Sequence, residues 1–272
     1  MASQHAYPLG YTPEEANRLQ VQAELLGEVF EDALRRAGLR EGMRVLDLGC
    51  GVGDVSFLAA RLVGPSGAIL GVDQSEPSLI AAKTRATHSE VTNVSFKTAK
   101  LETYDPDETF DAIIGRFVLL YLPDPAGVLK RLRSCLRPGG IVVMQELDMS
   151  VASQYPASDL FTEVNRWIFS AFEAGGAEKD MGRKLLSTFL AAGLPWPELG
   201  SVTPLTSGEN SAYYAMLTEM VRSMLPLIER TGLTTRAGTG LETLTRRLRD
   251  DAVANKRALF PPRIVSAWSS VI

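Results

Sequence analysis

The segment Val45-Leu46-Asp47-Leu48-Gly49-Cys50-Gly51-Val52-Gly53 decides the fold of this chain. Its first four residues are typical of a short buried strand, and the three alternating glycines predict a tight turn directly after it. Because glycine has no Cβ, a nucleotide-like ligand can approach the backbone of this turn closely. The apolar spacing that follows predicts a helix over 54–63, whose N-terminal amides would face the same ligand.

A second strand is expected over 68–72, and it leads into Asp73, twenty residues after Gly53. A carboxylate at this place can accept both hydrogen bonds from a ribose diol. Strand, glycine turn, helix, strand and acid together make half of a nucleotide-binding fold. Two classes of cofactor use this arrangement, and the spacing of the glycines helps to separate them.

The dinucleotide fingerprint G-x-G-x-x-G, counted from Gly49, would place its last glycine at Asp54. A side chain there would crowd the helix against the strand and repel a pyrophosphate, which disfavours a nicotinamide-dependent oxidoreductase. The spacing Asp47-x-Gly49-x-Gly51-x-Gly53 instead resembles that of the class I S-adenosylmethionine-dependent methyltransferases. Their cationic sulfonium cofactor carries no phosphate, so nearby acids are tolerable.

The resemblance continues along the chain in the family's order. It is carried by Phe110-Asp111-Ala112-Ile113-Ile114-Gly115-Arg116, similar to the fourth strand, by Leu120-Tyr121-Leu122-Pro123-Asp124-Pro125, similar to the loop after it, and by Leu136-Arg137-Pro138-Gly139-Gly140, similar to the turn before the fifth strand. This order over about a hundred residues implies an α/β fold: a Rossmann-like, seven-stranded, mostly parallel sheet with helices on both faces and an antiparallel last strand.

The apolar pattern predicts where the elements lie. Core strands are expected over 43–48, 68–72, 93–97, 110–115 and 140–146, with helices over 54–63, 76–87 and 125–136. Later helices are expected over 159–174, 180–192, 211–230 and 241–256. The resemblance places the sixth and seventh strands over 199–205 and 263–271.

Three regions follow from this pattern. Residues 1–40 form an N-terminal helical segment, whose amphipathic helix runs from Pro13 to Ala37 and ends at Gly38. Residues 41–150 form the cofactor-binding core. Residues 151–272 supply the rest of the sheet, with helical insertions over 151–175 and 211–256. We expect these insertions and the N-terminal segment to form a lid over the carboxyl edge of the sheet, where ligands bind in such folds.

The composition is that of an ordinary cytoplasmic enzyme: 272 residues, 45% hydrophobic, 22% charged and a net charge of −4. No apolar run approaches the roughly 20 residues that cross a bilayer, and the N-terminus lacks the pattern of a secretion signal. Cys50 and Cys135 predict two free thiols and no metal site. The isoelectric point of about 5.4 argues against a long nucleic acid as partner and favours a small-molecule acceptor. The oligomeric state is open, with a homodimer as one option.

The resemblance implies the cofactor contacts. Gly49, Gly51 and Gly53 would contact the methionine part, Asp47 its amino group, and Asp73 with its neighbour Gln74 the ribose hydroxyls. The family's acid after the third strand is missing here, where the chain has Thr98-Ala99-Lys100-Leu101-Glu102, so Leu101 would contact adenine through its backbone amide. Further candidates are Arg116 and Phe117, beside the methionine part, and Tyr11, Arg18 and Gln22, from a segment that folds over the cofactor in some small-molecule members.

Methyl transfer from a sulfonium is a single in-line displacement, which requires alignment and exclusion of water but no protein nucleophile. A general base is needed only where the acceptor must lose its proton in the slow step. The chain has only two histidines, His5 and His88, and neither is placed for this role. The catalytic candidates are therefore Glu146, expected at a strand end that faces the pocket, then Tyr121 and Asp148, or no base at all.

The region after 150 is rich in aromatic and methionine residues. These favour a small, largely apolar acceptor, methylated at carbon, oxygen or nitrogen and typical of secondary metabolism, although helix packing alone would explain most of them. They are Tyr155, Phe161, Trp167, Phe169, Phe172, Tyr213, Tyr214, Met216, Met220 and Met224. Quinones or sterol-like lipids are the alternative acceptors, and a protein or RNA is less favoured. A non-catalytic module that binds the cofactor is the alternative of another class.

Overall fold

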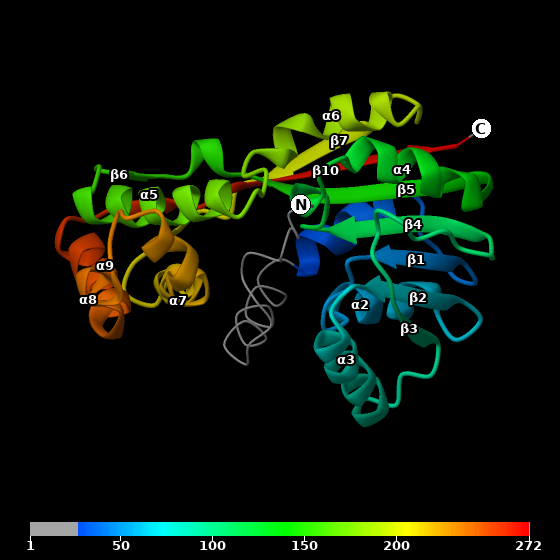
Figure 1. Cartoon of the computed structure of the whole chain (residues 1–272), viewed down its shortest axis with the longest axis horizontal. Coiled ribbons are helices and arrows are strands. Elements are labelled where there is room, and N and C mark those ends of the chain that lie inside the picture. The colour runs from blue at the N-terminus through cyan, green and yellow to red at the C-terminus, as the bar shows by residue number, and fades with distance from the viewer. Residues whose placement is uncertain (1–26, 272) are drawn as a thin grey trace. The chain divides into compact units, whose positions relative to one another are not determined.

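The computed structural model describes residues 27–271, which divide into two compact units (Figure 1). Residues 27–147, 181–201 and 264–271 form the first, here named the sheet unit. Residues 148–180 and 202–263 form the second, here named the helical unit. The chain therefore leaves the sheet unit twice and returns to it twice.

A seven-stranded sheet is the centre of the sheet unit, with the strand order β3-β2-β1-β4-β5-β10-β7. Strands β1 to β5 pair in parallel. Gly140, toward the start of β5, hydrogen-bonds through its backbone to Val271, just after the end of β10. Gln145, later in β5, hydrogen-bonds through its side chain to Ser266, earlier in β10. The two strands therefore run antiparallel. The strands are β1 (Arg44–Leu48), β2 (Ala68–Asp73), β3 (Val94–Thr98), β4 (Phe110–Arg116), β5 (Leu136–Asp148), β7 (Glu198–Val202) and β10 (Arg263–Ser270).

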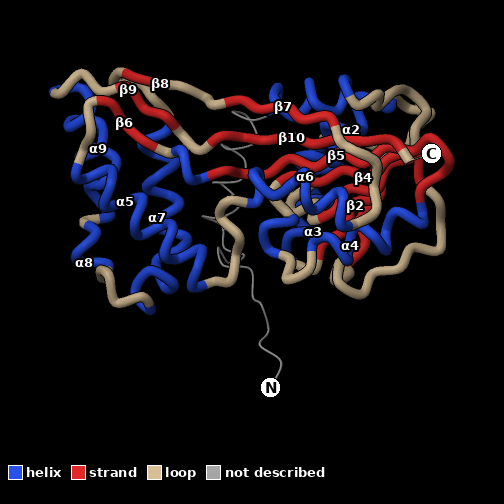
Figure 2. Tube along the Cα trace, turned by 90° about the horizontal axis from the view of Figure 1, so that it is seen from above, coloured by secondary structure: helices blue, strands red, loops and turns tan. Residues whose placement is uncertain are grey.

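Helices flank this sheet, as Figure 2 shows. They are a helix over 27–36, α2 (Asp54–Val63), α3 (Glu76–His88), α4 (Pro125–Leu132) and α6 (Met181–Ala191), with short 3-10 turns η1 (Leu119–Tyr121) and η2 (Arg133–Cys135). Phe30 and Leu34 of the first helix and Leu58 of α2 are buried with Ile114 and Val143 of the sheet in one core cluster. Burial of this apolar stripe, at about 25 cal/mol per Å², fixes both helices on the sheet.

The helical unit has its own small sheet, in which β9 pairs antiparallel with β6 and β8. Its elements are η3 (Met149–Val151), β6 (Ser153–Tyr155), α5 (Asp159–Ala174), β8 (Thr206–Ser207), α7 (Tyr213–Arg230), α8 (Arg236–Thr239), α9 (Leu241–Ala254) and β9 (Ala258–Phe260). Helix α7 contacts both α5 and α9. Trp167, Phe172 and Tyr214 are almost fully buried in this unit.

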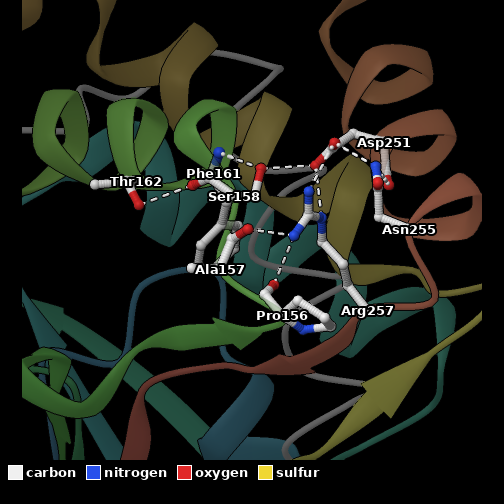
Figure 3. A network of polar contacts seen from close by, with 8 residues as sticks. All are labelled: Pro156, Ala157, Ser158, Phe161, Thr162, Asp251, Asn255 and Arg257. Carbon is white, nitrogen blue, oxygen red and sulfur yellow. Dashed lines mark hydrogen bonds and ion pairs between the residues drawn. The ribbon is translucent and has the colours of Figure 1, made fainter.

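A polar network joins the start of α5 to the end of α9 (Figure 3). The Ser158 hydroxyl accepts from the Phe161 amide at 3.2 Å, which caps α5, and donates to Asp251 Oδ2 at 2.6 Å. Arg257 Nε donates to the same oxygen at 3.1 Å, and Arg257 Nη1 donates to the Pro156 carbonyl at 2.8 Å. Segments about a hundred residues apart in the sequence are thereby held together.

The predicted fold class is confirmed, and most predicted elements lie within a few residues of their expected positions. Three strands of the helical unit, β6, β8 and β9, and the short α8 were not expected. Helix α4 ends at Leu132, four residues early, and β5 starts four residues before the expected 140. The first half of the predicted N-terminal helix lies outside the described residues. The insertions expected over 151–175 and 211–256 belong to the helical unit, and their action as a lid stays a prediction.

Candidate functional site

The glycine turn joins β1 to α2 through three residues with positive φ. The φ angles of Gly49, Gly51 and Gly53 are 62°, 52° and 91°. L-residues with a Cβ rarely adopt this left-handed region, at a cost of roughly 1–2 kcal/mol each. The amide of Cys50 donates to the Val72 carbonyl at 3.1 Å, which ties the turn to β2.

The three glycines are needed for different reasons. A Cβ on Gly49 would lie 2.4 Å from Val118 Cγ2, and one on Gly53 would lie 3.0 Å from the Phe57 ring. A Cβ on Gly51 would meet no atom within 4 Å. The open approach expected for all three glycines is therefore a property of Gly51, whereas Gly49 and Gly53 make room for side chains of the protein itself.

Asp73 connects the end of β2 to this turn. Its Oδ2 accepts from the Gly51 amide at 2.9 Å, and its Oδ1 accepts from the Ser75 amide at 2.8 Å. Burial raises the pKa of Asp73, and the backbone amides of Ser75, Gly51 and Gln74 oppose the rise. A carboxylate has about four acceptor sites, and three of them take these amides, so Asp73 keeps the capacity to accept one further hydrogen bond, as from a hydroxyl.

Asp47 lies beneath the turn with a side chain that is 1% exposed. Its Oδ2 accepts from the Ser56 hydroxyl at 2.6 Å, while its Oδ1 has no hydrogen-bond partner within the part of the chain that the structure describes. Burial raises the pKa of Asp47 to about 7, against the opposing effects of Ser56 and of the charge of Arg116. The negative charges of Asp73 and Asp54 raise it further, so a cation bound here would relieve the repulsion.

Two arginines balance part of this negative charge. Arg85 of α3 pairs with Asp54 at 2.7 Å and donates to the Val52 carbonyl at 2.7 Å. Arg116, at the end of β4, lies with its guanidinium carbon 6.0 Å from the centre of the Phe117 ring. Burial lowers the pKa of Arg116, and the charges of Asp54 and Asp47 oppose this. Sequence reasoning missed Ser56 and Arg85, which only the tertiary structure brings to the turn.

The other predicted cofactor residues lie on the loops after β2, β3 and β4. Phe117 has a φ of 54°, and its amide donates to the Gln145 carbonyl at 2.8 Å. Leu101 is 6% exposed, and its carbonyl accepts from the Arg131 guanidinium. Gln74 follows Asp73 directly and contributes its amide to that carboxylate. Tyr11, Arg18 and Gln22 lie outside the described residues.

The three catalytic candidates have different surroundings. Glu146 has an exposed fraction of 0%, and its Oε1 accepts from the amides of Val118 at 3.0 Å and Leu119 at 2.7 Å. Asp148 belongs to the helical unit, where its Oδ1 accepts from the Ser150 amide at 3.1 Å and its Oδ2 lies 3.7 Å from Arg263 Nε. The half-buried Tyr121 closes η1 through its amide. Glu146 was expected to face a pocket, and it is instead enclosed.

Burial raises the pKa of Glu146 to about 8, and hydrogen bonds from the backbone amides of Leu119, Val118 and Leu120 limit the rise.

Within residues 27–271 there is no group of histidine, cysteine or acidic side chains that could hold a metal ion. Among the described helices, none is both long and apolar enough to span a membrane.

Residues 39–188 of the chain match the family described as the methyltransferase domain. The chain belongs to the methyltransferase-domain family. The ubiquinone biosynthesis O-methyltransferase of Bradyrhizobium diazoefficiens is 32% identical to this chain over 139 residues, which cover 51% of this chain and 53% of the relative. The aklanonic acid methyltransferase of Streptomyces sp. strain C5 is 37% identical over 100 residues, which cover 36% of this chain and 46% of the relative.

The chain spans about half the length of the curated relatives that it matches. Among solved structures, the YcgJ protein from Bacillus subtilis has the same fold, with a TM-score of 0.55 and 16% identity, over 91% of this chain and 98% of that one. The predicted resemblance to class I S-adenosylmethionine-dependent methyltransferases is thereby confirmed at the level of family and fold.

Proposed function

We propose that this chain transfers a methyl group from S-adenosylmethionine to a small, largely apolar metabolite. The observation that carries the proposal is the pairing of Gly51 with Asp73. Gly51 offers an open backbone, and its amide bonds to a carboxylate at the end of the neighbouring strand. Membership of the methyltransferase-domain family supports the same conclusion.

The residues present fit this cofactor. Asp47 Oδ1, buried and without a partner among the described residues, can accept from the cofactor's ammonium group. Asp73 can accept from a ribose hydroxyl at the acceptor site that its three backbone amides leave. The negative charges of Asp54 and Asp73 are close enough to raise the pKa of Asp47. A ligand that brings positive charge would reduce this repulsion.

When bound, the cofactor supplies a methyl group that is activated by the sulfonium charge. The chain then has to hold the cofactor, align the acceptor and exclude water. Gly49, Gly51 and Gly53 would form the floor, with Gln74, Leu101, Arg116 and Phe117 around it. Of the base candidates, Tyr121 is half-buried and stays a proposal for acceptors that must lose a proton.

The acceptor class rests on the relatives more than on the aromatic side chains. Trp167, Phe172, Tyr214 and Met224 are at most 2% exposed, so packing within the helical unit explains them. The relatives named for ubiquinone biosynthesis and for aklanonic acid support a small-molecule acceptor, and quinones remain within the proposal.

Two matched glycine variants test the cofactor site. Gly51 and Gly139 both have positive φ, and a Cβ on either would meet no atom within 4 Å. Gly51→Ala and Gly139→Ala therefore carry the same backbone strain, roughly 1–2 kcal/mol, but only the first adds a methyl group to the proposed site. We expect Gly51→Ala to weaken binding of S-adenosylhomocysteine, measured by calorimetry, by about tenfold or more, and Gly139→Ala to bind like the parent. Equal affinity of both variants would contradict the placement.

Turnover is tested with isotope-labelled S-adenosylmethionine, a metabolite extract and mass spectrometry. Label in a small molecule supports the enzyme, whereas cofactor binding with no labelled product would indicate a non-catalytic module. Thermal unfolding with S-adenosylhomocysteine against NAD addresses the oxidoreductase alternative, because only the bound ligand raises the unfolding temperature.

A further inference from the structure

The loop after β4 packs directly against the glycine turn. Val118 Cγ2 lies 2.4 Å from the place of a Cβ on Gly49, and Val118 Cγ1 lies 2.9 Å from that of one on Gly115. The Val118 side chain therefore occupies the space that two glycines leave free. The preceding residue, Phe117, has a φ of 54°, a conformation that is unfavourable for a non-glycine residue and has to be held by its surroundings.

Two consecutive residues of β5 hold this loop. The Gln145 carbonyl accepts from the Phe117 amide at 2.8 Å. Glu146 Oε1 accepts from the next two amides, those of Val118 and Leu119, at 3.0 and 2.7 Å. Three successive amides that follow β4 are thus satisfied from one short stretch of β5, which fixes the loop at the point where it meets Gly49.

The surroundings of Glu146 are those of a structural acceptor. Its side chain is fully buried, and Oε2 has no hydrogen-bond partner among residues 27–271. Of the ion pairs found in the described chain, none involves Glu146. A general base has to reach the proton of the acceptor, directly or through one water molecule. Glu146 reaches backbone amides instead.

We propose that Glu146 is a positioning residue for the cofactor site. It holds the loop Phe117–Leu119 so that Val118 supports the glycine turn at Gly49, which keeps the Gly51 amide in line with Asp73. This proposal rests on the proposed function, because the turn is taken to be the floor of the S-adenosylmethionine site. It assigns Glu146 a role that acts through Val118 and not through contact with either substrate.

Two variants of Glu146, one variant of Val118 and one control test this proposal. Glu146→Gln keeps an oxygen that accepts from the same two amides, Glu146→Leu removes it at similar volume, and Val118→Ala removes the support of the turn. Asp124→Ala is the control, since it removes a bond of the same kind, from the Gly127 amide to Asp124 Oδ1 at 2.8 Å, which caps α4. Binding of S-adenosylhomocysteine is measured by calorimetry, kcat and KM with labelled cofactor, and folding by circular dichroism.

We expect Glu146→Gln to bind within about twofold of the parent and to keep its kcat. Glu146→Leu should bind about tenfold more weakly, which equals about 1.4 kcal/mol, and should raise KM for the cofactor. Val118→Ala should lose affinity in the same direction and decides the question if Glu146→Leu does not fold. Asp124→Ala should bind like the parent.

Two results would overturn the proposal. One is parental affinity in folded Val118→Ala, or in Glu146→Leu if it folds. The other is a Glu146→Gln variant with parental affinity but a kcat reduced by about 10²–10⁴, which is the loss expected for a general base. Failure of the parent chain to bind S-adenosylhomocysteine would instead refute the proposed function, so the two failures are distinguishable.

Discussion

Replacing Glu146 by Gln should stabilise the protein at neutral pH. Burial raises the pKa of Glu146 from 4.5 to about 8, and the Gln side chain accepts from the same amides without ionising. Below pH 4.5 the carboxyl group is protonated in both the folded and the unfolded protein. Between pH 4.5 and about 8 the unfolded chain releases this proton while the folded chain retains it, so the parent loses stability as the pH rises.

The magnitude follows from the same two pKa values. Each unit of pKa difference corresponds to about 1.4 kcal/mol, and pH 7 lies 2.5 units above the unfolded pKa of 4.5. The part of the stability difference that depends on pH should therefore favour Glu146→Gln by about 3 kcal/mol at pH 7, relative to the difference measured below pH 4.5. This part of the difference should vanish below pH 4.5 and reach a plateau above about pH 8. Asp47 also has a raised pKa, but it titrates in both proteins and cancels in the comparison.

Urea unfolding of the parent and of Glu146→Gln, at several pH values from about 4 to about 8, measures the difference in their free energies of unfolding. Fluorescence of Trp268, which is 5% exposed in the sheet unit, can follow the transition. A difference in free energy that does not change with pH would refute the reasoning. A variant that is less stable than the parent at pH 7 and gains no stability relative to the parent between pH 4.5 and about 8 would show that Glu146 is ionised in the fold and stabilised by the amides of Val118 and Leu119.

Three further predictions concern packing at Gly49, the cap of α5 and the pKa of Asp47. Gly49→Ala should destabilise the sheet unit by about 2–4 kcal/mol, from strain and from overlap with Val118, and adding Val118→Ala should recover part of this loss in urea unfolding. Ser158→Ala should lower the free energy of unfolding by about 1–2 kcal/mol through loss of the α5 cap, followed by the fluorescence of the buried Trp167 in the helical unit. Ser56→Ala should raise the pKa of Asp47 further, because it removes the hydroxyl that opposes the effect of burial. In calorimetry, the pH below which S-adenosylhomocysteine binding weakens should therefore be higher for this variant than for the parent.

The elements of the sheet unit could be predicted because their signals are local. Apolar runs such as 43–48, ended by glycines with positive φ, mark both the strands and the turns between them. The strands β6, β8 and β9 could not be found in this way. They have two or three residues each, and β6 pairs with residues about a hundred positions later, so no periodicity develops within one segment.

The residues of the candidate site likewise fall into those that local spacing predicts and those that only tertiary contacts reveal. Gly51 and Asp73 could be placed from spacing alone, because a strand-turn-helix unit fixes where the next strand ends. The role of Glu146 could not, because its partners are amides of a loop on a neighbouring strand, 27 and 28 residues away. An acid at the end of a strand is equally consistent with a base and with a loop anchor until its burial is known.

The strand order has a consequence for how the chain matures during synthesis. Strand β10 is inserted between β5 and β7, yet it is made about sixty residues after β7, since Val202 ends β7 and Arg263 begins β10. Until then a nascent chain would hold β5 with a bare edge and β7 without a neighbour in the sheet, the kind of exposed edge that favours aggregation. The intervening residues of the helical unit emerge first, so completion of the large sheet has to wait for them, and a ribosome stalled within that stretch would leave an aggregation-prone product.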